Sequence, residues 1–344
     1  MRHLLFTACD VGTANFLLPV FKKLTIPYAL FAQGEAAVLF KAKGIGFTPV
    51  PPCYWSDLQH VGEEILKTGR FTHVIAGTSW GATVDKAITQ AAKMHRIPSV
   101  AIVEHWNLYR ERFSRIENGE VFDVCMYMPD RIWVNDTYAK KDAIEAGLPE
   151  DKLIEAGQPF LESQYNRLIS KDDKPSNNHI VFISERIKDD FVEGSSIGKK
   201  YNEYIVLDLL IESMDFSKNK LLIKLHPQEE SDKYNYLKGR GLDIEVIKDC
   251  DIADLIRRSY KITGMGSMLL LEAALVRSDV ISILPDTSPE EFIGNKIGAT
   301  LFAPTCSDIK KYLDISPSPI GKSSFGERFL GSVATLVKLI ENMQ

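Results

Sequence analysis

The feature that most constrains the fold is an alternation, repeated along the chain, of short apolar β-prone runs with longer amphipathic runs. This alternation is typical of βα units, in which helices cover both faces of a parallel sheet. The first series predicts strands at His3–Ala8, Tyr28–Ala32, Thr48–Val50, Thr72–Ala76, Pro98–Val103, Arg131–Val134 and Lys152–Ala156. The second series predicts strands at Ile180–Ser184, Lys220–Leu225, Leu242–Ile247, Tyr260–Thr263, Val280–Leu284 and Ala299–Phe302.

A polar segment separates the two series. Ser170–Asn178 (SKDDKPSNN) lacks apolar side chains and contains Pro175, a composition typical of a linker. With 344 residues the chain is long enough for two domains. We predict two facing α/β domains with parallel sheets, both Rossmann-like. The predicted divisions are an N-terminal domain over 1–169, a linker over 170–178, a C-terminal domain over 179–325 and a terminal helix over 326–344.

The charge and cysteine content exclude several classes of protein. A net charge of -5 gives no general attraction to nucleic acid or to anionic lipid, so phosphate binding must depend on a few local groups. The five cysteines show no C-x-x-C spacing, which argues against a zinc site or a disulfide framework. No apolar run approaches the roughly 20 residues of a spanning helix. We expect a cytoplasmic protein without metal or cofactor, and at most peripheral membrane contact.

A glycine-containing turn in the second series is the most informative candidate site. Gly264 and Gly266 follow a predicted strand, and Ser267 is a natural N-cap for the helix that starts at Met268. Free backbone N–H groups and the helix dipole at such a turn suit a phosphate group. Glu272 lies further along the helix, where its carboxylate could accept hydrogen bonds from ribose hydroxyls. Alternatively, the turn is only structural and Glu272 faces solvent.

Two further strand ends in the second series carry polar side chains. Lys224 and His226 alternate onto one face of a strand that Pro227 ends, and a histidine there can donate a hydrogen bond to phosphate. Ser184 and Arg186 follow the first strand of this series and could also contact phosphate or line the site. A purely structural role is the alternative for each.

The first series has a carboxylate directly after its first strand. Asp10 is followed by Gly12 and Thr13, and a carboxylate at the carboxyl end of a strand can act as a general base. The alternative is that Asp10 or Thr13 only caps the next helix. Ser79 and Trp80 follow the fourth strand at the same edge.

The fifth strand ends at Glu104, His105 and Trp106. Glu104 and His105 are further candidate bases, and Trp106 could offer an aromatic surface to a sugar ring or an apolar acceptor. Because all these residues follow parallel strands, they are expected at one edge of one sheet.

Three segments resemble the GT-B glycosyltransferase superfamily. Arg131–Asp136, with Gly147–Pro149 and Lys152–Pro159, looks like the closing strand–helix–strand of its N-terminal domains. Lys224–Pro227 is similar to the His-Pro element of bacterial sialyltransferases, Kdo transferases and polyol-phosphate transferases that use CDP-activated donors. Gly264–Ala274 resembles the superfamily's phosphate and ribose segment.

The resemblance implies a nucleotide-sugar donor in the C-terminal domain, an acceptor in the N-terminal domain and no required metal. It assigns phosphate contacts to His226, Gly266 and Ser267, and ribose contacts to Glu272. Asp10 is then the candidate base, with Glu104 or His105 as the alternative.

We therefore predict a metal-independent glycosyltransferase that moves a sugar to a hydroxyl of a carbohydrate or lipid-linked acceptor, in surface glycan or polysaccharide biosynthesis. One alternative is a UDP-sugar 2-epimerase or a nucleotide-sugar hydrolase of the same fold, whose site should hold several carboxylates and basic groups. Another is a nucleotide-sugar-binding protein without catalytic activity.

Overall fold

The computed structural model describes residues 3–169, 177–190 and 198–343, and the chain divides into two compact units. Unit 1 combines Met1–Glu162 with Phe329–Gln344, and unit 2 is Ser163–Arg328. The division falls inside helix α6 (Pro159–Leu168). It therefore differs from the boundary predicted at 170–178, a segment of which only 177 and 178 lie among the described residues.

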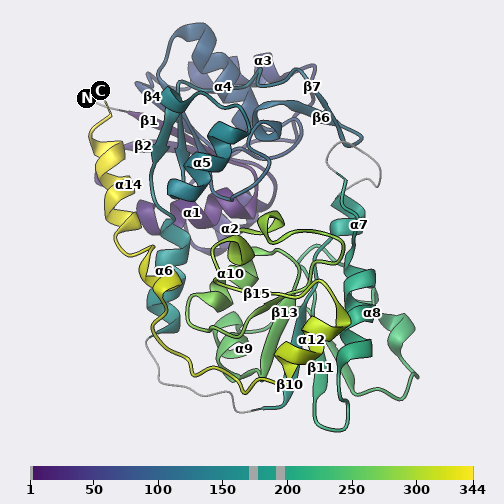
Figure 1. The fold of residues 1–344 in the computed structure, drawn as a ribbon. Coiled ribbons are helices and arrows are strands. Elements are labelled where there is room, and N and C mark those ends of the chain that lie inside the picture. The colour runs from purple at the N-terminus through teal and green to yellow at the C-terminus, as the bar shows by residue number, and fades with distance from the viewer. Residues whose placement is uncertain (1–2, 170–176, 191–197, 344) are drawn as a thin grey trace. The chain divides into compact units, whose positions relative to one another are not determined.

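Unit 1 contains a seven-stranded parallel sheet with the order β3-β2-β1-β4-β5-β8-β9. Its strands are β1 (Leu4–Ala8), β2 (Tyr28–Ala32), β3 (Thr48–Pro49), β4 (His73–Ala76), β5 (Ser99–Val103), β8 (Arg131–Val134) and β9 (Leu153–Glu155). Figure 1 labels its strands β1, β2 and β4. All five residues of β1 are buried, as expected for a strand covered on both faces. The strand order reverses between β1 and β4, where ligands bind in open α/β sheets.

Helices cover both faces of this sheet. They are α1 (Val11–Phe21), α2 (Gly34–Ala42), α3 (Leu58–Lys67), α4 (Val84–His95), α5 (Thr137–Glu145) and α14 (Ser332–Glu341). One core cluster joins α1, α2 and α14 to alternate residues of β1, including Leu4 and Phe6. A second cluster packs α3 and α4 against the opposite face, around Leu5.

Two features of unit 1 differ from the sequence-based expectations. The segment after β5 forms the antiparallel hairpin β6 (Arg115–Glu117) and β7 (Glu120–Phe122), which the βα pattern does not predict. The helix predicted over 326–344 is interrupted, because Gly331 adopts a positive φ of 88° and α14 begins only after it. Helix α14 lies beside α1 (Figure 1). Its residues Leu336 and Ile340 belong to the core cluster.

Unit 2 contains a six-stranded parallel sheet with the order β12-β11-β10-β13-β14-β15. Its strands are β10 (His179–Ile183), β11 (Lys220–Lys224), β12 (Ile244–Ile247), β13 (Lys261–Gly264), β14 (Ile281–Ser282) and β15 (Leu301–Phe302). Its helices are α7 (Ile187–Asp190), α8 (Glu203–Ser213), α9 (Ile252–Arg258), α10 (Met268–Ala274), α11 (Ile293–Lys296), α12 (Cys306–Leu313) and α13 (Ser324–Glu327).

Both sheets confirm the predicted fold class of parallel α/β domains. Each predicted strand is present, and no strand end differs from its prediction by more than two residues. Among the described residues, no helix combines the length and apolar character needed to cross a membrane.

A buried charge cluster fixes β13 and α10 in unit 2. Lys261 and Arg277 are at most 1% exposed, and both contact Asp279, with Nζ and Nη2 lying 3.1 and 2.8 Å from Oδ2. Arg277 also donates to the carbonyls of Ile256, Ser259 and Tyr260. Burial alone would raise the pKa of Asp279, but Arg277 and Ser318 lower it to about 2.

We predict that Asp279→Asn lowers the free energy of unfolding by about 3–5 kcal/mol, because it leaves Lys261 and Arg277 buried without their counter-ion. Urea denaturation measures this change. Asp254→Asn, which removes an exposed i,i+4 pair with Arg258, is the matched control and should cost no more than about 0.5 kcal/mol. Equal effects of the two substitutions would contradict the prediction.

Candidate functional site

In unit 1 the strand register brings the predicted site residues to one edge. Thr7 pairs with Ala76, Ala76 with Ala101, and Val103 with Val134, so the segments after β1, β4, β5 and β8 lie side by side. These segments contain Asp10, Ser79 and Glu104 at the place where the strand order reverses. The edge is therefore the candidate site of unit 1.

Asp10 and Glu104 both lie close to Gly12. A Cβ added to Gly12 would stand 3.0 Å from Glu104 Oε1 and 3.4 Å from Asp10 Oδ1, so a larger residue here would crowd Glu104. Asp10 also caps α1, since its Oδ1 accepts a 2.8 Å hydrogen bond from the N–H of Thr13. Asp10 therefore caps α1 and also lies at the candidate site.

Glu104 is buried and bound to a cation. Arg112 Nη1 lies 3.3 Å from its Oε1 and also donates to the hydroxyl of Thr78. Burial raises the pKa of Glu104; Arg112 opposes this increase, while the nearby Asp10 adds to it. The two carboxyl groups therefore differ in environment, because Asp10 is half-exposed and Glu104 is 9% exposed.

A second buried carboxylate lies beneath this edge. Asp85 of α4 is 1% exposed and accepts hydrogen bonds from the hydroxyls of Thr7 (2.7 Å) and Ser79 (2.8 Å). Burial raises its pKa, and the two hydroxyls counteract part of that increase. The adjacent Lys86 donates to the carbonyl of Ser79 at 2.7 Å, and burial lowers its pKa to about 8.

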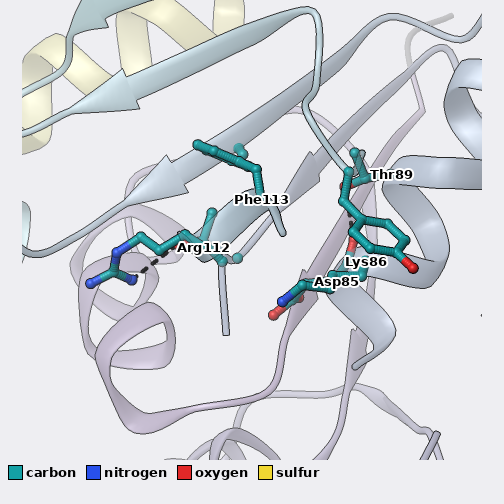
Figure 2. Close-up of a pocket in the computed structure, with 9 residues that line it drawn as sticks. Asp85, Lys86, Thr89, Arg112 and Phe113 are labelled. Atoms are coloured by element: carbon teal, nitrogen blue, oxygen red, sulfur yellow. Dashed lines mark hydrogen bonds between the residues drawn. The ribbon is translucent and has the colours of Figure 1, made fainter. Parts of the chain in front are cut away.

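Asp85 and Lys86 line a small pocket (Figure 2), in which there is room for roughly one water molecule. Asp85, Lys86 and Thr89 reach it from α4, whereas Arg112 and Phe113 reach it from the segment after β5. The charged side chains of its lining are one acid and two cations. Among the described residues, no group of three or more His, Cys, Asp or Glu side chains has a geometry that could hold a metal ion.

Other predicted residues of unit 1 are engaged within the protein. Trp106 is 7% exposed, its indole N–H donates to Asp136 at 3.0 Å, and its ring contacts Phe329. Trp106 thus exposes little of its ring, and its contact with a ligand stays a prediction. His105 Nδ1 accepts from the N–H of Trp106 at 3.0 Å. Thr13 is fully buried, whereas Trp80 is 37% exposed at the site edge.

In unit 2 the strand order reverses between β10 and β13, and the predicted glycine turn follows β13. Gly264 packs against Ile183, whose carbonyl oxygen would lie 3.1 Å from an added Cβ. Ser267 caps α10 by accepting from the N–H of Leu270 at 3.4 Å, and Met268 begins the helix. The local structure of the turn is therefore as predicted.

The N–H groups of this turn bind a carboxylate of the protein itself. Glu185 Oε1 accepts from the N–H of Gly266 at 2.8 Å and from that of Met265 at 3.2 Å. Burial raises the pKa of Glu185 to about 7, although these hydrogen bonds favour the ionised form. Glu185 lies between Ser184 and Arg186, which the sequence predicts as site residues, but is not itself among the predicted residues.

The His-Pro element is held by a buried network. Glu229 accepts from the backbone N–H of His226 at 2.7 Å and from the hydroxyl of Ser184 at 2.7 Å, and it pairs with Lys233. The hydroxyls of Ser184 and Tyr234 lie 2.6 Å apart. Ser184 is thus a positioning residue for the turn that carries His226.

The remaining predicted residues of unit 2 have internal partners. Lys224 is buried and donates to the carbonyl of Leu225, Arg186 pairs with acidic residues of α7, and Pro227 is exposed. Glu272 is 8% exposed and accepts from Gln164 Nε2 at 2.5 Å, which corrects the alternative that it faces solvent. Burial raises the pKa of Glu272 to about 7.

Some residues near the candidate sites were not predicted, and the sequence offers a different signal for each of them. Asp85 and Lys86 are charged residues among Val84, Ala87 and Ile88 of a predicted helix, and that position indicates a buried charged pair. Glu185 follows a predicted strand directly, so the strand-end criterion includes it. Arg112 lies in a segment without periodicity, and its pairing with Glu104 has no signal in the sequence.

Comparison with solved structures defines the class of fold. The structure is similar to UDP-GlcNAc 2-epimerase from Neisseria meningitidis bound to UDP-GlcNAc, with a TM-score of 0.65, 14% identity and coverage of 99% of this chain and 100% of that chain. UDP-GlcNAc 2-epimerase from Methanocaldococcus jannaschii is similar with a TM-score of 0.62 and 14% identity, and the match covers 100% of this chain and 100% of that chain. Anabaena HepE in complex with UDP and glucose is similar with a TM-score of 0.60 and 10% identity, and the match covers 99% of each chain.

The chain therefore has the two-domain GT-B fold. At 10–14% identity these likenesses show the fold alone. No protein-family model matches the sequence, and the search of curated proteins gives no match. The resemblance to the GT-B superfamily is thus confirmed for the fold, but its narrower form, the His-Pro group of transferases, is not shown.

We predict that Gly77→Ala lowers the free energy of unfolding by about 1–3 kcal/mol, because its Cβ would stand 2.7 Å from Thr13 Oγ1 and 2.8 Å from Asp85 Oδ2. Urea denaturation checks this value. At Gly46 an added Cβ meets nothing within 4 Å, so Gly46→Ala is the control and should be close to neutral. If Gly77→Ala left the free energy of unfolding unchanged, the buried groups around Gly77 would have to rearrange without loss of stability.

We also predict a pH dependence that originates from Glu272. Its pKa is raised from 4.5 to about 7, so the stability that protonation contributes is present below about pH 4.5 and is lost as pH rises through 7. Glu272→Gln should therefore be more stable than the wild type at pH 8, by up to about 3 kcal/mol, and similar to it near pH 4.5. Denaturation curves at both pH values test this, and a constant difference between the proteins would exclude it.

Proposed function

We propose that the chain is an enzyme that acts on a nucleotide-activated sugar. Unit 2 holds the nucleotide at the end of its sheet where the strand order reverses. In this proposal Gly264, Gly266, Ser267 and His226 contact the phosphates, and Glu272 contacts the ribose. The GT-B fold supports the proposal, as do the ligands of similar structures, which contain UDP-GlcNAc or UDP with glucose.

The reaction that the geometry supports best is epimerisation at C2 of the sugar, as in a UDP-sugar 2-epimerase. A base can remove the C2 proton as the C1–O bond to UDP breaks, which leaves UDP and a sugar with a C1–C2 double bond. An acid then returns a proton to the opposite face of C2 while UDP adds back to C1, and the 2-epimer results. The observation that carries the proposal is the pair Asp10 and Glu104, two carboxyl groups that both lie beside Gly12 and differ in exposure. Two carboxyl groups at one site can serve as an acid and a base.

Arg112 has a supporting role in this reaction. Its guanidinium lies beside Glu104 and favours the ionised carboxylate, against the effect of burial. Burial and Arg112 thus act in opposite directions on the pKa of Glu104, which suits a group that carries a proton. Asp85, Lys86 and the pocket behind Ser79 then fix the position of this edge from beneath.

Glycosyl transfer is the second candidate, since the same fold serves it. One observation favours it: Trp80 is a partly exposed aromatic ring at the site edge of unit 1, where it can contact the ring of an acceptor sugar. In that reaction Asp10 deprotonates the acceptor hydroxyl, and the groups of unit 2 stabilise the departing phosphate.

We predict that the protein, incubated in D₂O with UDP-GlcNAc and no acceptor, forms the 2-epimer with deuterium at C2, as detected by NMR. Glu104→Gln should lower the turnover number at least about 10²-fold, because it removes the proton-transferring group while keeping its shape. Glu111→Gln is the control, since Glu111 lies on the same segment and shows no side-chain contact with Glu104 or Arg112. A product that forms only with an added acceptor would favour transfer, and the 2-epimer without deuterium would exclude this mechanism.

A further inference from the structure

The strongest unexplained feature of unit 2 is that a phosphate-type turn is already occupied by an acid of the protein. Glu185 follows β10 and the turn follows β13, the two neighbouring strands between which the strand order reverses. The N–H groups of Met265 and Gly266 both point at Glu185 Oε1. An entering phosphate therefore meets N–H groups that already have an acceptor.

Two anions cannot share these N–H groups at low cost. A carboxylate and a phosphate within a few ångström repel each other. A protonated carboxyl group avoids this repulsion, because its O–H can donate a hydrogen bond to a phosphate oxygen. Protonation of Glu185 therefore releases the two N–H groups and adds one donor.

The charged neighbours of Glu185 do not remove the need for protonation. Lys199 lies near enough to favour the ionised carboxylate, but it also pairs with Glu291. Arg186, the next residue along the chain, pairs with Asp189 and Asp190. Tyr201 also faces Glu185, and its pKa is raised by burial and by the carboxylates of Glu185 and Glu291.

The pKa of Glu185 lies in the range where a bound phosphate can change its protonation state. Burial raises its pKa to about 7, against the hydrogen bonds from Gly266 and Met265 and the charge of Lys199. Near neutral pH the group is therefore divided between its two forms, so a bound anion can shift it by a modest change in environment.

We propose that Glu185 is a binding residue of the nucleotide site and takes up one proton as the nucleotide phosphate enters. The proton comes from solvent and goes to the Glu185 carboxylate, and no covalent bond of the nucleotide changes. This inference rests on the proposed function, because it assumes that unit 2 binds a nucleotide at this turn. It adds that the binding is coupled to pH.

The test is calorimetric titration with UDP-GlcNAc, whose pyrophosphate diester has no group that titrates near pH 7. The full chain with Glu104→Gln is used so that turnover does not contribute heat. Titrations at pH 8 in buffers of different ionisation enthalpy give the number of protons taken up. We expect close to one proton, and an affinity about tenfold lower at pH 8 than at pH 6, as linkage requires for a pKa of about 7.

Adding Glu185→Gln should abolish proton uptake and make the affinity independent of pH. The amide keeps an oxygen that can accept hydrogen bonds from the N–H groups of Met265 and Gly266, so the turn should remain folded. The number of protons taken up by the parent protein is measured without this variant. Glu230→Gln is the matched control: Glu230 is exposed, lies in the same unit, and its loss should leave uptake unchanged.

Three results would overturn the inference. Binding without proton uptake, equal in Glu185→Gln, would remove Glu185 from the site while leaving the nucleotide-binding role of unit 2 intact. Loss of binding in Glu185→Gln alone would show that the ionised carboxylate itself contacts the ligand. Absence of binding in every protein would overturn the proposed function, and the inference with it.

Discussion

A strand that is buried on both faces can present polar groups to a ligand only where it ends. In both sheets this constraint sends the chemistry to the carboxyl ends of the strands, because the strands themselves consist of apolar residues in contact with helices. The register then decides which strand ends are neighbours. Asp10 and Glu104 are separated by 94 positions in the sequence, yet both lie beside Gly12 because β1, β4 and β5 are adjacent.

Burial of acids is the second property that both units share. The buried Asp85 and Glu104 in unit 1, and the buried Glu272 and partly exposed Glu185 in unit 2, all have pKa values raised chiefly by burial. Each has hydrogen-bond donors or a cation near its carboxyl oxygens, which keeps the ionised form accessible. Buried acids of this kind cost stability and are concentrated at functional sites in proteins. Asp279 is the contrast, because its two cations lower its pKa and its role is structural.

The sequence is sufficient to predict the strands of both sheets and the candidate residues that follow those strands. Continuous apolar runs locate the strands, and the residues directly after them include Asp10, Glu104, Gly266 and His226. Partners are harder to predict, because pairing depends on contacts between distant segments. Arg112 meets Glu104 through a segment with no periodicity, and Glu229 meets His226 through a turn. Trp106 shows the opposite error, since an aromatic residue at a strand end can equally be part of the core.

The position of α14 has a consequence for synthesis of the protein. Its residues Leu336 and Ile340 lie in the core of unit 1 with Leu4 and Phe6 of β1, so that core joins segments more than 300 positions apart. Domains usually fold in turn as the chain leaves the ribosome. Here unit 2 can assemble while unit 1 still has an uncovered apolar face over α1 and α2. The first unit to be translated is therefore the last to be completed, and its exposed face is available to a chaperone until then.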